Sequence, residues 1–361
     1  MSALRREQVE AEVLRLMTDP HSDDFDRMAL DVFAYQCAAN RSYHAYCERR
    51  GVWPETVTHW SEIPALPTAA FKEADLLSAP AEKIFVTSGT TRGGGKRGRH
   101  GFPTLALYET SLKENFRTHL LPDDARLPMI LLAHSPEEMP TSSLSHMLGI
   151  VRRAWGAEGS RYYVRGGRVD CESVVAAFSR AEAEGTPVFL LGVTVAYVQV
   201  VEYCRERKIR FRLPTGSRLM DTGGFKGRRP ERSREALLRD YTDLFGIPAE
   251  WCVNEYGMTE MGSQFYDNTA LAAWQGISTP RWKVIPPWVR TRIVDPETGE
   301  ELPEGKVGCL LHYDLANCGS VMALETEDLG CRVGEGFEIV GRLPGAEVRG
   351  CSEMIDVSGK G

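Results

Sequence analysis

The sequence predicts an α/β fold with helix-covered sheets, followed by a β-rich subdomain. From Lys83 onward, short β-branched or apolar runs alternate with segments of helical length and periodicity. After about residue 280, this alternation gives way to strands joined by tight turns. A chain of 361 residues can form two or three domains with a large core, without disulfides or metal ions to support it.

The N-terminal segment is predicted to be helical. Amphipathic patterns cover residues 3–17 and 25–50, the second ending at Gly51, and a proline-rich connector follows over residues 53–67. The later elements are assigned from apolar runs of strand length and from apolar faces of helical period. In order they are strand 84–87, helix 104–119, strand 129–133, helix 143–155, strand 161–164, helix 170–184, strand 188–191, helix 194–207, strand 218–222, helix 231–244, strand 251–253, and strands 289–294 and 307–313 on either side of a turn at 295–299.

Composition narrows the class of protein. Asp and Glu number 50 against 43 Lys and Arg, and this acidic balance disfavours a nucleic-acid-binding surface. The apolar runs are far shorter than the roughly 20 residues of a membrane span, and the N-terminus lacks the apolar core of a secretory signal. We therefore expect a cytoplasmic protein whose nine cysteines are mostly buried thiols, because no Cys-x-x-Cys pair or zinc-site spacing occurs.

A Ser/Thr/Gly-rich loop follows the first predicted strand, within the segment Ile84–His100. It combines backbone N–H groups, hydroxyl donors and five basic or imidazole side chains, which suits a polyphosphate. It is not a Walker A loop, because Thr90 replaces the first glycine and Arg97 follows Lys96. The alternative is a flexible surface turn with solvated basic residues.

A second segment, Trp251–Met261, leads from a buried strand into a turn. Tyr256 can stack on a base, Thr259 can bond to a phosphate, and Glu260 can hold Mg²⁺ through oxygen. Alone, this turn could equally be a helix cap. Further along, Asp328 and Arg342 could meet ribose hydroxyls and phosphate, or simply form a surface salt bridge with each other or with neighbours.

Four motifs now stand in order along the chain: Thr87-Ser-Gly-Thr-Thr91, Tyr256-Gly-Met-Thr-Glu260, Asp328 and Gly341-Arg342. Together they resemble the core motifs of the adenylate-forming ligase superfamily, whose members activate carboxylates as acyl-AMP. Pro136–Met147 and Asn254–Asp267 are similar to the acyl-protein synthetase (LuxE-like) branch. The resemblance extends from about residue 60 to Cys351 and implies the N-terminal body of an adenylate-forming enzyme.

The resemblance implies an ATP site and a magnesium ion. Thr259 would contact the α-phosphate, Glu260 would bind Mg²⁺, and Arg342 would act at the domain edge. The residues implied at the β- and γ-phosphates of ATP are Thr87, Ser88, Gly89, Thr90 and Thr91. Those implied around adenine are Gly223, Gly224 and Phe225, within Asp221–Phe225, and Asn254, Glu255, Tyr256, Gly257 and Met258. Asp328 is implied at the ribose.

The sequence departs from the superfamily pattern in two places. The Gly93–Arg99 stretch makes the phosphate loop longer and more basic than usual. Only twenty residues follow Gly341, so the C-terminal lid domain of longer relatives is expected to be absent or vestigial. That lid supplies a lysine to the adenylation site, and Lys226 and Lys360 are the two candidates to replace it.

The acyl group is expected to reach a cysteine. In the acyl-protein synthetase branch, a cysteine near the C-terminus takes the acyl group as a thioester, and Cys351 matches that position; an ordinary terminal thiol is the alternative. Ser143 and His146, on the predicted helix 143–155, are candidates for the substrate pocket, with Ser142 or Ser145 as alternatives near the carboxylate. A histidine that merely packs the helix is as plausible from the sequence.

These observations predict an ATP- and Mg²⁺-dependent ligase that forms acyl-AMP, acylates itself and delivers the acyl group to a partner such as an acyl reductase. One alternative is direct transfer to coenzyme A, a carrier protein or an amine; another is a non-catalytic nucleotide-binding scaffold. The sequence does not identify the carboxylic acid substrate. The expected domains are an N-terminal helical region (1–80), a nucleotide- and acyl-binding core (81–270), a β-rich subdomain (271–345) and a tail (346–361).

Overall fold

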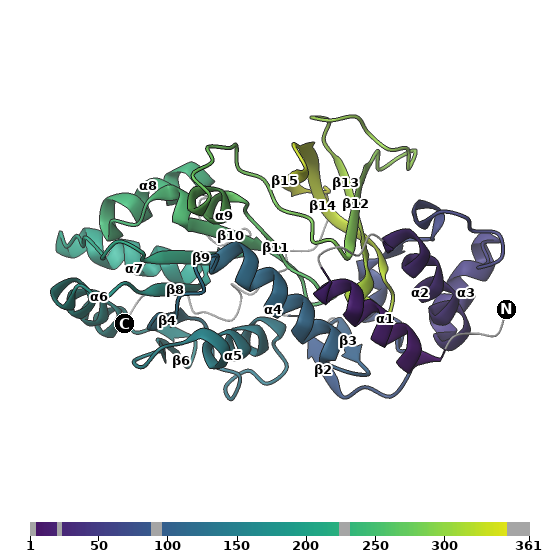
Figure 1. Ribbon diagram of the computed structural model, residues 1–361, viewed down its shortest axis with the longest axis horizontal. Coiled ribbons are helices and arrows are strands. Elements are labelled where there is room, and N and C mark those ends of the chain that lie inside the picture. The colour runs from purple at the N-terminus through teal and green to yellow at the C-terminus, as the bar shows by residue number, and fades with distance from the viewer. Residues whose placement is uncertain (1–4, 20–23, 88–95, 224–231, 345–361) are drawn as a thin grey trace.

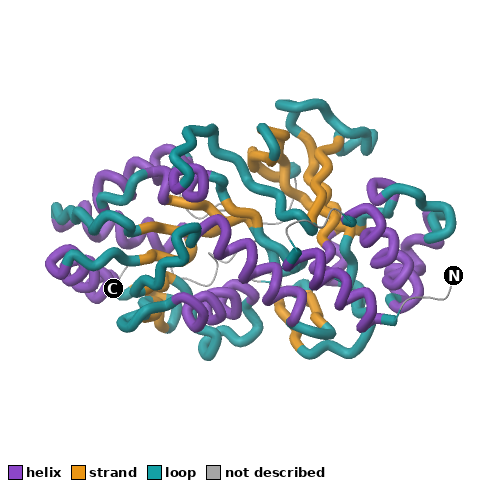
Figure 2. The backbone as a smooth tube through the Cα atoms, in the orientation of Figure 1, coloured by secondary structure: helices purple, strands orange, loops and turns teal. Residues whose placement is uncertain are grey.

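The computed structural model describes residues 5–19, 24–87, 96–223 and 232–344. Figure 1 shows a helix-flanked sheet at the left, a second sheet at the upper right and three helices beyond it at the right. The same division is visible in the tube of Figure 2, where most helix lies around the first sheet and at the N-terminal end. The predicted α/β class with a β-rich region after residue 280 is thus confirmed.

The first sheet has six strands in the order β11-β10-β9-β8-β4-β5, parallel except for the β10–β11 pair. Three of its central strands are buried along their whole length, which explains their continuous apolar sequence. The strands are β4 (Met129–Leu132), β5 (Arg161–Tyr162), β8 (Phe189–Val193), β9 (Arg218–Thr222), β10 (Cys252–Tyr256) and β11 (Phe265–Tyr266).

Helices connect and cover these strands. Ser142, Asp170 and Ser233 each accept a hydrogen bond from a backbone N–H of the first turn and so cap α5, α6 and α8, and Gly185 and Gly246 end helices in the left-handed conformation. The helices are α4 (Ala106–Leu120), α5 (Ser143–Trp155), α6 (Cys171–Glu184), α7 (Thr194–Arg207), α8 (Arg234–Phe245) and α9 (Thr269–Trp274).

The second sheet is mainly antiparallel and shares a hydrophobic core with the N-terminal helices. Its strands are β12 (Val289–Val294), β13 (Gly308–Asp314), β14 (Ala323–Val333), β15 (Gly336–Arg342) and the short β1 (Leu66–Pro67), which pairs with β14 in parallel. The helices that pack here are α1 (Arg6–Thr18), α2 (Phe25–Ala39) and α3 (Arg41–Arg50). Two small hairpins complete the fold, β2 (Lys83–Val86) with β3 (Arg99–Phe102) and β6 (Val164–Arg165) with β7 (Arg168–Val169).

Three predicted elements were wrong in detail, one of them the strand over 161–164, which is divided between β5 and β6 in two separate sheets. The single helix over 25–50 is two helices, because Asn40 adopts an extended conformation and its side chain caps α3 by accepting from the Tyr43 backbone N–H. The Asn40 amide also donates to the Ser320 carbonyl, 3.1 Å away, so a distant contact fixes the break. The strand predicted over 251–253 starts at Cys252 and continues to Tyr256, because residues 249–251 form a 3₁₀ turn.

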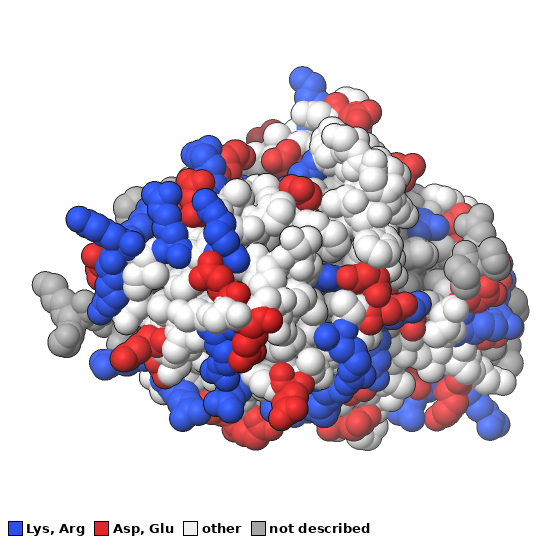
Figure 3. All heavy atoms as spheres, turned by 60° about the vertical axis from the view of Figure 1, so that its left-hand side comes forward, with Lys and Arg blue, Asp and Glu red and all other residues white. Residues whose placement is uncertain are grey.

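Charged side chains of both signs lie on the face seen in Figure 3, and most cysteines in the described ranges are buried. Figure 3 shows acidic and basic side chains interspersed over most of the face in view, with several basic side chains gathered at its upper left. No helix within the described ranges is both long and apolar enough to span a bilayer. All eight cysteines in those ranges are unpaired, and six of them are buried.

Three buried histidines make the fold sensitive to acid. Burial lowers the pKa of His100 and His119 from 6.5 to about 4, and that of His312 to about 3. Below pH 6.5 the unfolded chain therefore binds protons that the native chain does not, and stability is lost as the pH falls. Asp314 opposes this trend. Burial raises its pKa from 3.8 to about 6, so in this pH range the native state binds a proton that the unfolded chain does not.

We expect the free energy of unfolding, measured with urea, to decrease as the pH falls from about 6.5 to about 4.5. His312→Asn should flatten this dependence by about 1.4 kcal/mol per pH unit, whatever the substitution costs at neutral pH. The same substitution at exposed His59 is the matched control for the loss of a histidine side chain. An unaltered slope in the His312 variant would contradict the assignment.

Candidate functional site

The candidate site lies where β9 and β10 end side by side. The two strands are parallel neighbours, with Asn254 paired to Asp221 and Glu255 paired to Thr222. Gly223 follows β9 with a φ of +76°, a conformation that favours glycine, and it is exposed. The structure thus brings together the two segments that the sequence assigned to adenine, at the strand ends where ligands of parallel sheets usually bind.

Asp221 anchors this end of the sheet. Its carboxylate is fully buried and accepts from Arg234 Nη1 at 2.7 and 2.8 Å, from the Tyr241 hydroxyl at 3.0 Å and from Asn254 Nδ2 at 3.1 Å. These donors supply the charge and hydrogen bonds that a buried carboxylate requires. Asp221 therefore holds β9, β10 and α8 together.

A second buried carboxylate, Asp267, fixes the start of the turn after β10. It accepts from Lys283 Nζ at 2.8 Å, from Arg281 and from the Asn254 backbone N–H at 2.7 Å. Burial raises the pKa of Asp267, but the neighbouring cations outweigh it and hold the pKa at about 2. Lys283 Nζ also donates to the Asn254 carbonyl and side-chain oxygens, each at 2.7 Å, so Asn254 is held by protein contacts on several sides.

Glu255 and Gly257 fit closely against each other. Glu255 is buried, which raises the pKa of its carboxyl group, and it accepts a hydrogen bond from the Thr222 hydroxyl. A Cβ atom at position 257 would collide with Glu255 Oε1, so any other residue here would require the Glu255 side chain to move. Gly257 is exposed and Met258 is half-buried, which leaves the turn accessible beside the buried network.

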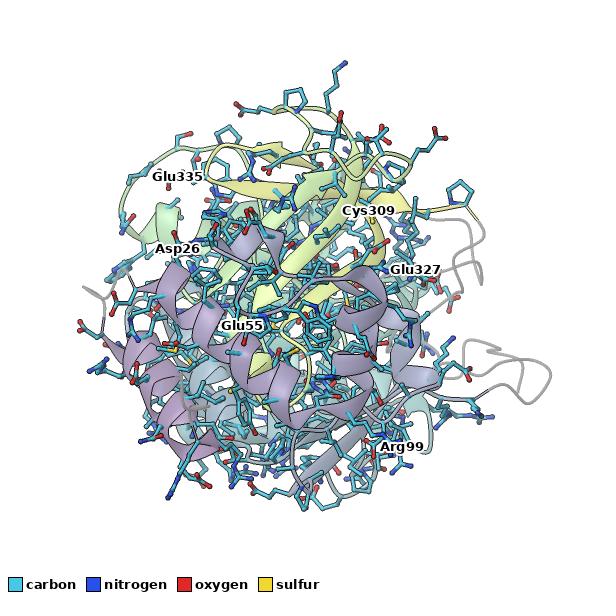
Figure 4. All side chains as sticks on the ribbon, turned by 90° about the vertical axis from the view of Figure 1, so that its right-hand side faces the viewer. Asp26, Glu55, Arg99, Cys309, Glu327 and Glu335 are labelled. Atoms are coloured by element: carbon cyan, nitrogen blue, oxygen red, sulfur yellow. The ribbon has the colours of Figure 1, made fainter. Side chains whose placement is uncertain are left out.

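Tyr256 connects the two sheets. Its hydroxyl donates to Asp328 Oδ2 at 3.0 Å, and Asp328 Oδ1 accepts from Arg342 Nε at 2.9 Å. Arg342 also donates to Glu327 at 3.0 Å, and Figure 4 shows Glu327 on β14 toward the edge of the molecule. The salt bridge between Asp328 and Arg342, which was the alternative interpretation of these two residues, therefore forms. It is mostly buried, since the Asp328 side chain is 16% exposed and the Arg342 side chain 23%. It also includes Tyr256. Asp328 lies within β14, and Arg342 is the last residue of β15.

The stem of the Ser/Thr/Gly-rich loop lies against Glu260. The Gly98 N–H donates to Thr87 Oγ1 and the Thr87 N–H to the Gly98 carbonyl, both at 2.9 Å. A Cβ atom at Gly98 would lie 3.7 Å from Glu260 Oε1, which places this buried carboxylate beside the stem. One carboxylate next to a predicted phosphate loop fits Mg²⁺, which is usually held by one or two carboxylates plus substrate phosphates.

His100 has a role that the sequence did not reveal. It was counted with the basic residues of the loop, but it is buried and its pKa is lowered to about 4, so it is neutral. Its Nδ1 lies 2.8 Å from the Thr259 carbonyl, which can only accept, and its Nε2 then accepts from the Ser320 hydroxyl at 2.8 Å. His100 thus joins β3, the turn at Thr259 and the loop before β14.

Ser143 and His146 lie along the strand that leads to Thr87. The His146 ring is 5.3 Å from Phe85 of β2, and its Nε2 is 3.5 Å from Glu109 Oε1. The Ser143 carbonyl accepts from the Tyr108 hydroxyl at 3.2 Å. The His146 contacts match the packing role that the sequence left open, while placing the start of α5 near the loop stem.

Several predicted residues lie outside the described ranges. They belong to the phosphate loop, the segment after β9 and the C-terminal tail. They are Ser88, Gly89, Thr90, Thr91, Gly224, Phe225, Lys226, Cys351 and Lys360. Their roles remain predictions.

The Asp267–Lys283 pair gives a direct test of what holds the turn. Asp267→Asn should lower the free energy of unfolding by about 3–5 kcal/mol, because Lys283 loses its buried counter-charge. Adding Lys283→Met should recover part of that loss. A double-mutant cycle in urea measures the coupling, and strictly additive effects would show that the two groups act independently.

Comparisons with known proteins give the family. The family model described as acyl-protein synthetase, LuxE, matches residues 6–358. The chain is 23% identical to the long-chain-fatty-acid–luciferin-component ligase of Aliivibrio fischeri, over 95% of this chain and 92% of that protein. The enzyme of the same name from Vibrio harveyi is also 23% identical, over 90% of this chain and 85% of its own length.

Solved structures confirm the fold. The crystal structure of an open conformation of 2-hydroxyisobutyryl-CoA ligase, in complex with 2-HIB-AMP and CoA, superimposes with a TM-score of 0.63 at 14% identity. The match covers 88% of this chain and 74% of that ligase. The protein is a ligase with the adenylate-forming fold, and it belongs to the acyl-protein synthetase, LuxE family.

Proposed function

We propose that this enzyme uses ATP to activate a long-chain fatty acid as acyl-AMP, transfers the acyl group to Cys351 and delivers it to an acyl reductase. The observation that carries the nucleotide step is the convergence of the Thr87–Gly98 stem, Glu260 and the Tyr256–Asp328 pair at the ends of β9 and β10. The names of the two bacterial relatives support the choice of acid and an acyl-accepting partner.

ATP would lie across the ends of the two strands. The segments at Gly223 and Asn254–Met258 would border adenine, and each Asp328 oxygen keeps a lone pair for a ribose hydroxyl beside its protein partner. The phosphates would extend toward the loop that starts after Thr87, and Thr259 would contact the α-phosphate. Arg342, held by Glu327 and Asp328, would add positive charge at that edge.

The adenylation step needs positioning and charge neutralisation, not a general base. A fatty acid carboxylate is already ionised at neutral pH. One of its oxygens attacks the α-phosphorus in line, a P–O bond forms, and the bond to pyrophosphate breaks. Mg²⁺ held by Glu260 and phosphate oxygens would neutralise charge on the leaving pyrophosphate. Lys226 or Lys360 would add a cation at the reacting oxygens.

The acyl group would then move to sulfur. The Cys351 thiol loses its proton to solvent, the thiolate attacks the acyl carbon, and a C–S bond forms as the C–O bond to AMP breaks. AMP leaves with the electron pair. The resulting thioester keeps the acyl group reactive while the partner binds. Ser143 and His146 would border the acid near the start of α5.

Glu260→Gln tests the magnesium role. It should slow fatty-acid-dependent ATP–pyrophosphate exchange about 100-fold and raise the Mg²⁺ concentration needed for half-maximal exchange, because an anionic ligand is lost. Glu250→Gln, at an exposed carboxylate on the turn before β10, is the control and should match the parent enzyme. An unchanged Mg²⁺ requirement in the Glu260 variant would overturn the assignment.

Cys351→Ala tests the acyl carrier. With ATP, Mg²⁺ and a labelled long-chain fatty acid, the parent enzyme should acquire label that neutral hydroxylamine releases. The variant should keep ATP–pyrophosphate exchange and lose the label, whereas Cys331→Ala, at a partly exposed thiol on β14, should keep both. Hydroxylamine-labile label on the Cys351 variant would exclude this cysteine. Exchange without any labelled parent protein would favour direct transfer to another acceptor.

A further inference from the structure

A separate cavity lies beside β5, the edge strand of the first sheet. Its volume is about 310 Å³, and it is lined by residues of the β4–α5 turn, α5, β5 and β6. Arg152 of α5, Arg161 and Tyr162 of β5, and Arg165 of β6 all line it. None of the residues placed above at the nucleotide is among its lining residues. The volume lies at the lower end of the range for small-ligand sites.

The three arginines in this cavity are not committed to carboxylates. Within the described ranges, no Asp or Glu oxygen lies within 4.0 Å of the guanidinium nitrogens of Arg152, Arg161 or Arg165. Arg152 instead lies over the Tyr162 ring, 5.6 Å from its centre. A single ion pair on a protein surface contributes little to stability. Three guanidinium groups that line one cavity, however, create a positive electrostatic potential there.

Tyr162 adds an unused hydrogen-bond donor. Its hydroxyl oxygen is buried and has no hydrogen-bond partner in the described part of the chain. Burial raises the pKa of Tyr162 to about 12, so the hydroxyl stays protonated at neutral pH and can donate. Buried polar groups in folded proteins normally have hydrogen-bond partners. The Tyr162 hydroxyl is therefore expected to donate a hydrogen bond to a group that is not part of the protein.

Two glutamates also line the cavity and limit its positive charge. Glu138 is engaged elsewhere: its carboxylate accepts from the Ser135 N–H at 3.3 Å and lies 3.5 Å from His134 Nδ1. Glu137 is exposed on the rim. The cavity is lined by three guanidinium groups and two carboxylates, which gives one net positive charge. Because Glu138 has partners of its own, the groups left to meet a ligand are mostly cations.

We propose that this cavity binds the phosphate group of a phosphate monoester. Guanidinium forks and a phenol hydroxyl are suitable donors for its three terminal oxygens. The partly exposed Tyr162 ring offers an apolar surface to the organic part of the ligand. The phosphate charge makes binding weaken as salt is added, and the contact with the organic part distinguishes a monoester from free phosphate.

The test is isothermal titration calorimetry on the full-length protein saturated with a non-hydrolysable ATP analogue, which occupies the nucleotide site. Phenyl phosphate is the monoester probe, inorganic phosphate tests the free anion, and benzenesulfonate is the monoanionic control. We expect saturable binding in the order phenyl phosphate, inorganic phosphate, benzenesulfonate. Tighter binding of inorganic phosphate than of phenyl phosphate would identify the free anion as the ligand and overturn the monoester assignment.

Three variants test the lining residues, two of which should raise the dissociation constant for phenyl phosphate and one of which should lower it. Arg161→Gln should raise the dissociation constant for phenyl phosphate at least about tenfold, and Tyr162→Phe should raise it several-fold. Glu137→Gln should lower it, because it removes a repelling charge. Arg180→Gln, at an exposed arginine on α6 outside the cavity, is the matched control. Equal affinities in all four variants, with unchanged thermal stability, would overturn the proposal, as would the absence of saturable binding.

Discussion

The buried ion pair between Asp267 and Lys283 is the constraint on which the candidate site depends. Two charges removed from water are tolerated only when every donor and acceptor has a partner, and here Asn254, Arg281 and the pair itself supply those partners. The network fixes Asn254, in the middle of β10. Tyr256, Thr259 and Glu260 follow within six residues of this anchor, so their positions depend on it.

The site is built from both sheets, and polar contacts connect them. Tyr256 reaches Asp328 on β14, while neutral His100 connects the Thr259 carbonyl to Ser320 before the same strand. Tyr256 lies on β10 of the first sheet and Asp328 on β14 of the second, whereas Thr259 follows β10 and Ser320 precedes β14. A shift between the sheets would therefore change the geometry around the nucleotide before it disturbed either hydrophobic core.

The sequence predicted the repeating strand and helix pattern, the motif segments and the family, because apolar periodicity and short local motifs are written in neighbouring residues. It did not predict the break at Asn40, which depends on Ser320, or the neutral state of His100, which depends on burial by distant segments. It also gave no signal for the Asp267–Lys283 pair. Burial and partners determine whether a polar residue binds a ligand or supports the fold, and both are set by tertiary contacts.

The contact between Asn40 and Ser320 has a further consequence, for how the chain folds. These residues are 280 positions apart, and Gln36 makes a similar contact with the Asn317 carbonyl, 281 positions away. Helix α2 therefore reaches its final packing only after nearly the whole chain has been synthesised. Contacts of such long sequence separation slow folding and leave early helices without their apolar cover on the ribosome. The N-terminal helices thus lack part of their final packing until residues near 320 have been synthesised.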